Sequence, residues 1–223
     1  MNTKRQISKR KIIFFQENIL KWYYLNGRDF PWRKKNINNY QRIISEILLQ
    51  RTRAETVNSF FPLFIKKFPT WKSLSTSPIE EIEEFIKPIG LYRQRSIKIK
   101  QLATEMVKRN GRFPKTRNLL ESIPGIGQYI SNAILLFVHN EPQPLLDVNM
   151  ARLLERFFGQ RELTDIRYDP FLQDLSLQIV SHQNAWELNW GILDFASKVC
   201  KIQSPLCNDC IIKKLCNHKS IIN

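Results

Sequence analysis

Apolar residues recur at the spacing of an α-helix along the whole chain of 223 residues. Ile43, Ile47 and Leu48 share one helical face, and Phe60 and Phe64 share another. Only 7 glycines occur, and few segments alternate as half-buried strands do, which argues against a β-sandwich or barrel. With 43% hydrophobic residues the chain can bury a substantial core. The pattern therefore predicts an all-α fold.

Proline and glycine breaks divide this pattern into segments of ordinary helix length. The sequence from Ser77 to Glu80 is typical of a helix start, because a serine cap is followed by Pro78 and by acidic residues in the first turn. It predicts a helix over residues 79–86. No internal repeat or long linker occurs, so a division into two domains would come from chain crossing rather than from a tether.

The chain carries 35 Lys and Arg against 20 Asp and Glu, for a formal net charge of +15. This surplus favours a polyanionic partner, with nucleic acid as the simplest one and solubility alone as the alternative. The longest apolar runs, such as residues 134–138, fall far short of the roughly 18 residues that a membrane helix needs. Near the start, Gln16 and Glu17 interrupt an apolar run, which favours an amphipathic helix over a signal peptide.

All four cysteines, Cys200, Cys207, Cys210 and Cys216, fall within residues 200–216. Such a cluster is typical of a local ligand set rather than of disulfides distributed to staple a fold, and it indicates a reducing compartment. The spacing C-x6-C-x2-C-x5-C suits either zinc or an iron–sulfur cluster, because both can be held by four cysteine ligands.

A short hairpin with the sequence Ile-Pro-Gly-Ile-Gly, residues 123–127, separates two apolar helical runs. Gly125 and Gly127 let the backbone approach a ligand closely, and the free N–H groups that open the second helix attract a phosphate. The segment does not fit a dinucleotide fingerprint, since the third glycine is missing and a helix precedes it. It is therefore either a sequence-independent grip on nucleic acid or a plain helix–turn–helix corner with a glycine cap.

Farther along, Asp147 follows a proline break at residues 142–144 and stands in an apolar neighbourhood. Its position corresponds to the first turn of a predicted helix, where an aspartate often serves as the N-cap. Taken alone, the position favours this capping role. The hairpin and Asp147 together favour a functional one.

The hairpin, followed by Leu-Asp-Val-Asn-Met-Ala-Arg at residues 146–152, resembles the helix-hairpin-helix-GPD superfamily of DNA glycosylases. Residues 30–33 are similar to its L-P-W-R motif, residues 44–52 to its S-E-x-x-L-Q-Q-T helix, and residues 89–96 to its G-L-x-x-x-R-A segment. The resemblance spans nearly the whole chain and implies two helical subdomains with a DNA-binding cleft between them. Residues 33–140 would form a six-helix barrel with the hairpin, and residues 1–32 together with 141–223 would form the iron–sulfur cluster subdomain.

The resemblance also favours one of the two metal alternatives. The cysteine spacing is that of the [4Fe-4S] cluster in endonuclease III-like and MutY-like glycosylases. It implies that the four cysteines hold a [4Fe-4S] cluster as cofactor. In this family the cluster supports DNA binding and structure rather than hydrolysis, and nearby lysines such as Lys213 and Lys214 would lie against the DNA backbone.

The family cleaves the N-glycosidic bond of a nucleotide that is flipped out of the duplex. The resemblance makes Asp147 the catalytic carboxylate, which stabilises positive charge on the sugar and orients or deprotonates water. Glu46 is either a surface charge of its helix or a residue of the pocket, and its apolar neighbours favour the pocket, where it would line the site and act as an acid or base. Tyr129 would pack on the flipped base or close the pocket. Lyase members carry a lysine at the position of Tyr129, so the enzyme is expected to be monofunctional.

The expected partner is double-stranded DNA that contains a mismatched or damaged base, and the resemblance implies a monomer in the prokaryotic cytoplasm without membrane contact. Gln50 matches the position that fills the gap left by the flipped base. The expected DNA-binding residues are Gln50, Arg51, Pro124, Gly125, Ile126, Gly127, Gln128 and Asn149. Arg93, Arg95 and Lys98 form a basic segment that is either a phosphate clamp or a solvated face.

Tyr129 also bears on the substrate, because MutY-type adenine glycosylases usually carry serine there, whereas tyrosine resembles the Mig-type thymine glycosylases. The chain stops seven residues after Cys216, without the further domain of MutY-type enzymes, and Arg51 departs from the usual L-Q-Q-T. Thymine or uracil opposite guanine is the expected target. The alternatives are a MutY-type adenine glycosylase, a catalytically inactive DNA-binding iron–sulfur protein, and a zinc deaminase suggested by His139, Glu141 and the cysteines.

Overall fold

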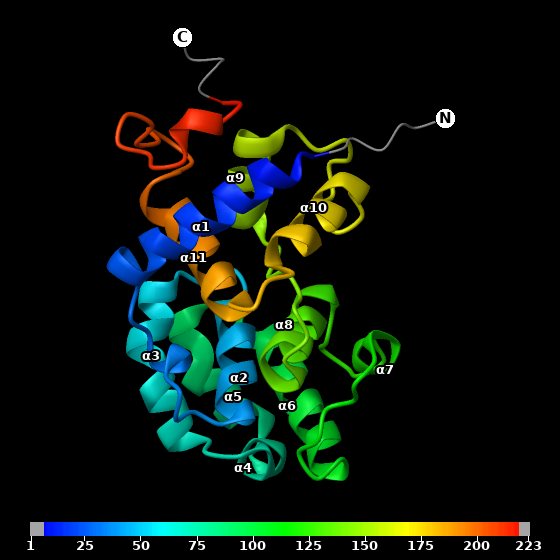
Figure 1. Cartoon of the computed structure of the whole chain (residues 1–223). Helices are drawn as coiled ribbons and strands as arrows, with labels where there is room; N and C mark the ends of the chain where they lie inside the picture. The colour runs from blue at the N-terminus through cyan, green and yellow to red at the C-terminus, as the bar shows by residue number, and fades with distance from the viewer. Residues whose placement is uncertain (1–6, 219–223) are drawn as a thin grey trace. The chain divides into compact units, whose positions relative to one another are not determined.

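The computed structural model describes residues 7–218, which contain eleven α-helices and no strand (Figure 1). The all-α prediction is confirmed, and the absence of strands from the described part of the chain argues against a deaminase fold. None of the helices in this range is long and apolar enough to cross a bilayer. The chain divides into two compact units, one made of Met1–Arg28 and Glu141–Asn223 and the other of Asp29–Asn140.

The first unit is built around two helices from opposite ends of the chain. Its elements are α1 (Lys9–Asn26), α9 (Val148–Phe158), α10 (Pro170–Val180), α11 (Ala185–Lys198) and the short 3-10 helix η3 (Lys213–Leu215). α1 lies across α11 (Figure 1) and packs closely on it at Gly191, where a Cβ would lie 3.0 Å from Cγ2 of Ile19. Phe15, Phe157 and Phe195 are fully buried in the core that these helices share. This core supports the start of α9.

The second unit carries the remaining helices. They are η1 (Pro31–Arg33), α2 (Asn39–Leu49), α3 (Ala54–Lys67), α4 (Trp71–Thr76), α5 (Ile79–Ile86), η2 (Lys87–Ile89), α6 (Tyr92–Lys108), α7 (Arg117–Glu121) and α8 (Gln128–His139). α2 is central, because it packs against both α3 and α8 and is buried on nearly all sides. Asn38 and Gln41 fix its start with a reciprocal capping box.

The boundary between the units lies between Arg28 and Asp29, four residues before the position expected from the sequence. The reason is the packing of two aromatic side chains. Phe30 stacks on Trp32 with ring centroids 4.5 Å apart, and Trp32 meets Phe61 of α3 edge to face. The segment that follows Arg28 therefore belongs to the core of the second unit.

α5 spans the predicted residues, Ile79–Ile86, but the predicted cap is wrong. Pro78 is the N-cap, and its carbonyl accepts a hydrogen bond from the backbone N–H of Ile82. The hydroxyl of Ser77 instead donates to the carbonyl of Ser73 in the preceding helix. Only two residues separate α4 from α5, so the hydroxyl of Ser77 can reach either helix. It bonds the last turn of α4 and therefore does not cap α5.

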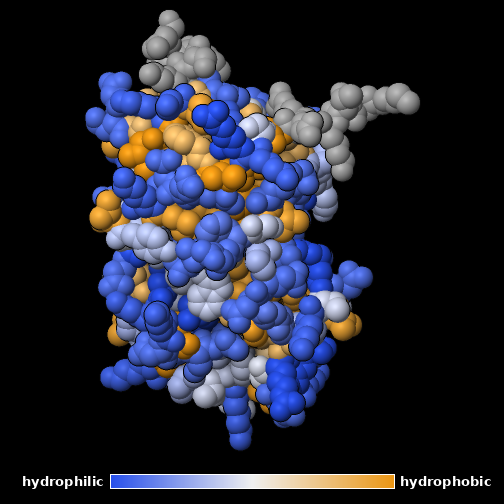
Figure 2. All heavy atoms as spheres, in the orientation of Figure 1, coloured by the Kyte–Doolittle hydropathy of each residue, from blue (hydrophilic) through white to orange (hydrophobic). Residues whose placement is uncertain are grey.

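The surface agrees with the net charge of +15. Hydrophilic residues cover most of the face shown in Figure 2. Exposed lysine and arginine side chains occur in both units, for example Lys21 and Lys201 in the first and Lys98 and Arg112 in the second. Both units therefore present positive charge to solvent.

Candidate active site and cysteine loop

Glu46 and Tyr129 come together in the second unit. Glu46 lies in the middle of α2 and is 3% exposed, which confirms that it is not a solvated surface charge. Tyr129 lies in the first turn of α8, the helix beside α2, and its hydroxyl donates to Oε2 of Glu46 over 3.0 Å. A buried carboxylate that accepts a phenolic hydrogen bond is held in one orientation.

The hairpin between α7 and α8 presents backbone rather than side chains. Gly125 has a φ of +86°, a conformation that favours glycine, and a Cβ there would lie 3.3 Å from the carbonyl oxygen of Lys98. Gly127 is the N-cap of α8, and a Cβ built on it would meet no atom within 4 Å. The start of α8 is thus open to a ligand, as the phosphate-grip hypothesis requires.

Among the residues expected to touch DNA in this hairpin, Pro124, Gly125 and Gly127 are exposed and Gln128 is half-buried. Ile126 is different, since it is 6% exposed and its side chain anchors the hairpin to the unit. Only its backbone can face a ligand. The hairpin is therefore a rigid loop with an apolar anchor and an exposed main chain.

Gln50 and Arg51 are exposed at the end of α2, where Arg51 adopts a left-handed conformation with a φ of +57°. The turn is held by Arg95 of α6, whose guanidinium donates to the carbonyl of Gln50 over 2.6 Å and to the hydroxyl of Thr52 over 3.0 Å. The same guanidinium donates to the carbonyls of Ile89 and Gly90.

This arrangement corrects the interpretation of the basic segment. Arg95 is buried, with its donors directed at four protein oxygens, so it is neither a phosphate clamp nor part of a solvated face. Arg93 and Lys98 remain exposed. A run of basic residues in the sequence thus includes one that acts inside the protein.

Asp147 belongs to the first unit and is the N-cap of α9. Its Oδ1 accepts from the backbone N–H groups of Asn149 and Met150, each over 2.8 Å, and its Oδ2 accepts from the side-chain amide of Asn149 over 2.8 Å. Burial raises the pKa of this carboxyl, although these hydrogen bonds and the charge of Arg152 act to lower it. The expected capping geometry is present, and it occurs in an environment that disfavours the carboxylate.

Asn149, expected to bind DNA, makes its side-chain contacts within the protein. Besides bonding Asp147, its amide oxygen accepts from Arg152 over 3.0 Å. The guanidinium of Arg152 also donates to the carbonyls of Ala196 and Cys200. A series of hydrogen bonds therefore links Asp147 through Asn149 and Arg152 to the carbonyl of Cys200.

The four cysteines lie on the segment that follows α11, here called the cysteine loop (residues 200–216). Arg156 of α9 ties this loop down by donating to the carbonyls of Lys201 and Ile202, and the side chain of Ile212 is buried in the core. The loop is thus fixed by the protein itself.

All four cysteines are partly buried. Burial raises the pKa of Cys210 to about 11, and the three other cysteines lie close enough to add to the rise. A metal that bound these thiols would have to displace their protons. Within residues 7–218, no three His, Cys, Asp or Glu side chains form a group placed to hold a metal ion. Four thiols on one loop are nevertheless the kind of donors that a four-cysteine cluster requires.

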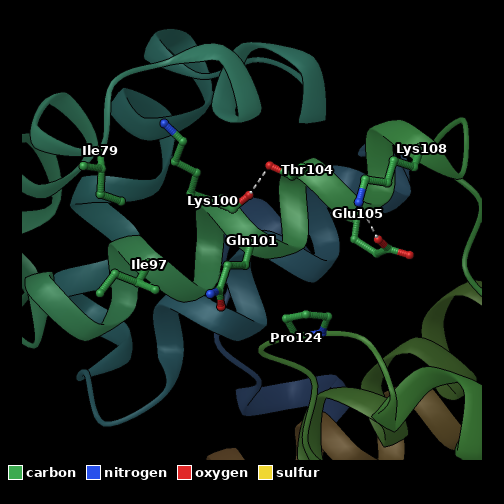
Figure 3. Close-up of a pocket in the computed structure, with 8 residues that line it drawn as sticks. All are labelled: Ile79, Ile97, Lys100, Gln101, Thr104, Glu105, Lys108 and Pro124. Carbon is green, nitrogen blue, oxygen red and sulfur yellow. Dashed lines mark hydrogen bonds and ion pairs between the residues drawn. The ribbon is translucent and has the colours of Figure 1, made fainter.

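A surface cavity of about 560 Å³ lies beside α6 in the second unit. Figure 3 shows side chains of α6, among them Lys100, Gln101 and Glu105, on one side and Pro124 of the hairpin on the other. None of the expected catalytic residues lines it. The cavity borders the hairpin but is not the candidate active site.

Two buried residues that hold candidate site segments were missed by the sequence analysis in this role. Arg95 fixes the turn that carries Gln50 and Arg51, and Asn189 of α11 bonds the segment that leads to Asp147. The only signal for Asn189 is a lone polar residue among apolar ones in a helix, between Leu188 and Trp190.

The family model for HhH-GPD superfamily base excision DNA repair proteins matches residues 44–173. The chain is 36% identical over 203 residues to the thymine/uracil-DNA glycosylase of Pyrobaculum aerophilum, with 88% of this chain and 87% of the relative covered. It is 32% identical over 204 residues to the adenine DNA glycosylase of Buchnera aphidicola, with 91% of this chain and 58% of the relative covered. The solved structure of a thermostable thymine-DNA glycosylase superposes with a TM-score of 0.86 at 30% identity, covering 95% of this chain and 98% of that one.

Proposed function

The chain belongs to the HhH-GPD superfamily of base excision DNA repair proteins, and from this premise we propose that it is a monofunctional DNA glycosylase for thymine or uracil opposite guanine. The observation that carries the proposal is the end-to-end similarity to a thymine/uracil-DNA glycosylase, with 87% of that relative covered. The adenine glycosylase relative is covered over only 58% of its length, which favours the thymine and uracil class.

Asp147 is the proposed catalytic carboxylate. In the reaction the bond between the sugar C1′ and the base nitrogen breaks, and positive charge develops on the sugar. An ionised Asp147 would stabilise that charge and accept a proton from the water whose oxygen bonds to C1′, while the departing base takes up a proton. Its raised pKa supports this role, because a base is most effective when its pKa lies nearer to the working pH.

Glu46 and Tyr129 are proposed to contact the flipped base. The hydrogen bond from Tyr129 leaves Glu46 with lone pairs that can accept from an N–H of a pyrimidine. Tyr129 provides an aromatic ring but no amine, so a Schiff base with the sugar cannot form at this position. The proposed product is therefore free base and an intact abasic site.

The grip on duplex DNA is proposed to come from the hairpin and from the turn at the end of α2. The exposed backbone at Gly125 and Gly127 and the open start of α8 suit a phosphate. Gln50 and Arg51 are exposed on a turn that Arg95 holds rigid, as residues that enter the space of a flipped nucleotide must be.

Cys200, Cys207, Cys210 and Cys216 are proposed to hold a [4Fe-4S] cluster. Four cysteines are a full ligand set for such a cluster, which would contribute structure and DNA affinity rather than a step of hydrolysis. Four cysteines gathered in one loop as a ligand set, together with a DNA substrate, favour a cytoplasmic location. Iron analysis and visible absorbance of anaerobically purified protein test the assignment: about four irons per chain are expected, and zinc without iron would contradict it.

The activity is tested with single-lesion duplexes that carry T·G, U·G, A·G or A·8-oxoguanine. Each reaction is divided between alkali and no treatment. Strand cutting at T·G or U·G that requires alkali is expected, because alkali breaks the abasic site that a monofunctional enzyme leaves. Cutting of the adenine strands alone would support the adenine glycosylase alternative. No cutting in any duplex would support a DNA-binding protein without catalysis.

A further inference from the structure

The segment that leads to Asp147 has no regular secondary structure. Residues 140–147 lie between α8 and α9 and belong to no helix or strand. Pro142 and Pro144 lack a backbone N–H, so the segment has few main-chain donors of its own. A segment without helix or strand hydrogen bonds needs other partners to fix its position.

Asn189 of α11 supplies those partners. Its side chain is 0% exposed. Its Oδ1 accepts from the backbone N–H of Leu145 over 2.7 Å, and its Nδ2 donates to the carbonyl of Gln143 over 3.2 Å. The other hydrogen of Nδ2 bonds the carbonyl of Ala185, one turn earlier in the same helix. The amide therefore pairs with the segment as a neighbouring strand would.

These three bonds orient the amide without ambiguity. The N–H of Leu145 requires an oxygen, and the two carbonyls require N–H donors, so a reversed amide would lose all three bonds. The pairing also restricts the register of the segment, because a shift by one residue would place the nitrogen of Pro144, which carries no hydrogen, opposite Oδ1. Asp147 is two residues beyond the bonded N–H.

We propose that Asn189 is the positioning residue for Asp147 in base release. The inference rests on the proposed glycosylase function. The capping bonds of Asp147 fix the carboxylate relative to α9, and the amide of Asn189 fixes the backbone that carries it relative to α11. Loss of the amide would leave α9 intact but would let the carboxylate of Asp147 move relative to the sugar of the bound nucleotide, by about 1 Å or less.

Gln16 offers a matched control. It is a buried amide in the same unit, and its Nε2 donates to the carbonyl of Ile179 over 2.6 Å, which links α1 to α10. That contact does not involve the segment before Asp147. Asn189→Leu and Gln16→Leu each remove a buried amide that bonds backbone, and only the first removes a partner of residues 143–145.

The experiment compares the two variants by thermal midpoint, by affinity for undamaged duplex and by single-turnover base release from a U·G duplex. Both variants are expected to lower Tm, on the order of 5 °C, with the larger loss in Asn189→Leu because it removes three hydrogen bonds rather than one. Base release is expected to fall about 100-fold in Asn189→Leu only, since displacements near 1 Å can have this effect. Duplex affinity is expected to stay unchanged in both.

A wild-type rate in Asn189→Leu, or an equal loss of rate in Gln16→Leu, would overturn the proposal. If Asn189→Leu does not fold, Asn189→Asp takes its place, because the carboxylate accepts from Leu145 but cannot donate to Gln143. A loss of about tenfold is then expected, and a wild-type rate would again overturn the proposal.

Amide hydrogen exchange separates this inference from the proposed function. The N–H of Leu145 is expected to exchange faster in Asn189→Leu than in wild type, and at the wild-type rate in Gln16→Leu. Unchanged exchange in Asn189→Leu would overturn the positioning role. If the wild-type protein releases no base from any duplex, the glycosylase function fails, and the exchange measurement still shows whether the amide holds the segment.

Discussion

Asp147 and Asp169 perform the same structural task in the same unit, yet the pKa values of their carboxyl groups shift in opposite directions. Each is the N-cap of a helix, Asp147 of α9 and Asp169 of α10, and each accepts three N–H hydrogen bonds. Burial acts to raise the pKa of both. In Asp169 the hydrogen bonds prevail and the pKa is lowered, whereas in Asp147 burial prevails and the pKa is raised.

The origin of the donors accounts for part of the difference. All three donors to Asp169 are backbone N–H groups, from Leu172 in its own helix and from Glu162 and Leu163 in the preceding loop, and Arg161 adds positive charge. The three donors to Asp147 belong to two adjacent residues, Asn149 and Met150, and one of the three donors is the side-chain amide of Asn149. Capping thus explains Asp169 completely. Asp147 has, in addition to its capping bonds, a pKa that burial raises, and a raised pKa is what the proposed catalytic role requires.

The largest expected effect is on the rate of base release, which should fall when Asp147 is substituted but not when Asp169 is. Asp147→Asn should lower single-turnover base release by about 10³-fold, because the amide cannot accept a proton or stabilise positive charge as a carboxylate does. Asp169→Asn should keep a rate within about twofold of wild type at temperatures well below its Tm. Duplex affinity should be unchanged in both. Substantial turnover in Asp147→Asn would show that the catalytic assignment is wrong.

For stability, the larger loss is expected in Asp169→Asn and the smaller in Asp147→Asn. Asp169→Asn places an NH2 group against backbone N–H donors in a fully buried position, which should cost about 3 kcal/mol and lower Tm by roughly 6–12 °C. Asp147→Asn should change Tm much less, because removing a carboxylate from an environment that disfavours it offsets the weaker cap. Thermal unfolding of the two variants at pH 7 tests this. A larger loss in Asp147→Asn would mean that its carboxylate is mainly structural.

The pH dependence of stability should have opposite signs at the two caps. Because the pKa of Asp169 is lowered on folding, its stabilisation is present above the unfolded pKa of about 3.9 and is lost as pH falls through the folded value. The Tm advantage of wild type over Asp169→Asn should therefore shrink below about pH 4.

The pKa of Asp147 is raised on folding, so the folded chain binds a proton that the unfolded chain has released. Wild-type stability should fall relative to Asp147→Asn as pH rises from about 4 through the folded pKa. Thermal midpoints measured between pH 3 and 8 for the three proteins test both signs. Parallel curves for wild type and Asp147→Asn would contradict the raised pKa.

The sequence predicted features that depend on local pattern. Helical periodicity was sufficient for the all-α fold and for the span Ile79–Ile86. The apolar neighbours of Glu46 correctly predicted its burial, because residues on all sides of a helix are apolar only when that helix is enclosed.

Features that depend on tertiary partners could not be predicted. Arg95 stands in a basic run, and only the fold brings its guanidinium to carbonyls near Gln50 and Gly90. Asn189 is 44 positions from Leu145, and its sequence neighbours indicate only a core helix. Asp147 and Asp169 are the same residue type, so the sequence could not predict their opposite pKa shifts. These shifts arise from hydrogen-bond donors and burial that only the fold supplies.

The smallest effect is expected from the one side-chain donor that distinguishes the two caps. Asn149→Ala removes the amide that donates to Oδ2 of Asp147 and leaves both backbone donors in place. Loss of a donor to the carboxylate should raise the pKa of Asp147 further. The acidic limb of the pH–rate profile should move to higher pH, with a rate about fivefold lower on that limb. Asn18→Ala, which removes an amide donor to the carbonyl of Phe14 in the same unit, should leave the profile unchanged. If Asn149→Ala instead weakens duplex binding and keeps the wild-type profile at saturating DNA, then Asn149 acts on DNA, as its motif suggested, and the tuning of Asp147 resides in burial alone.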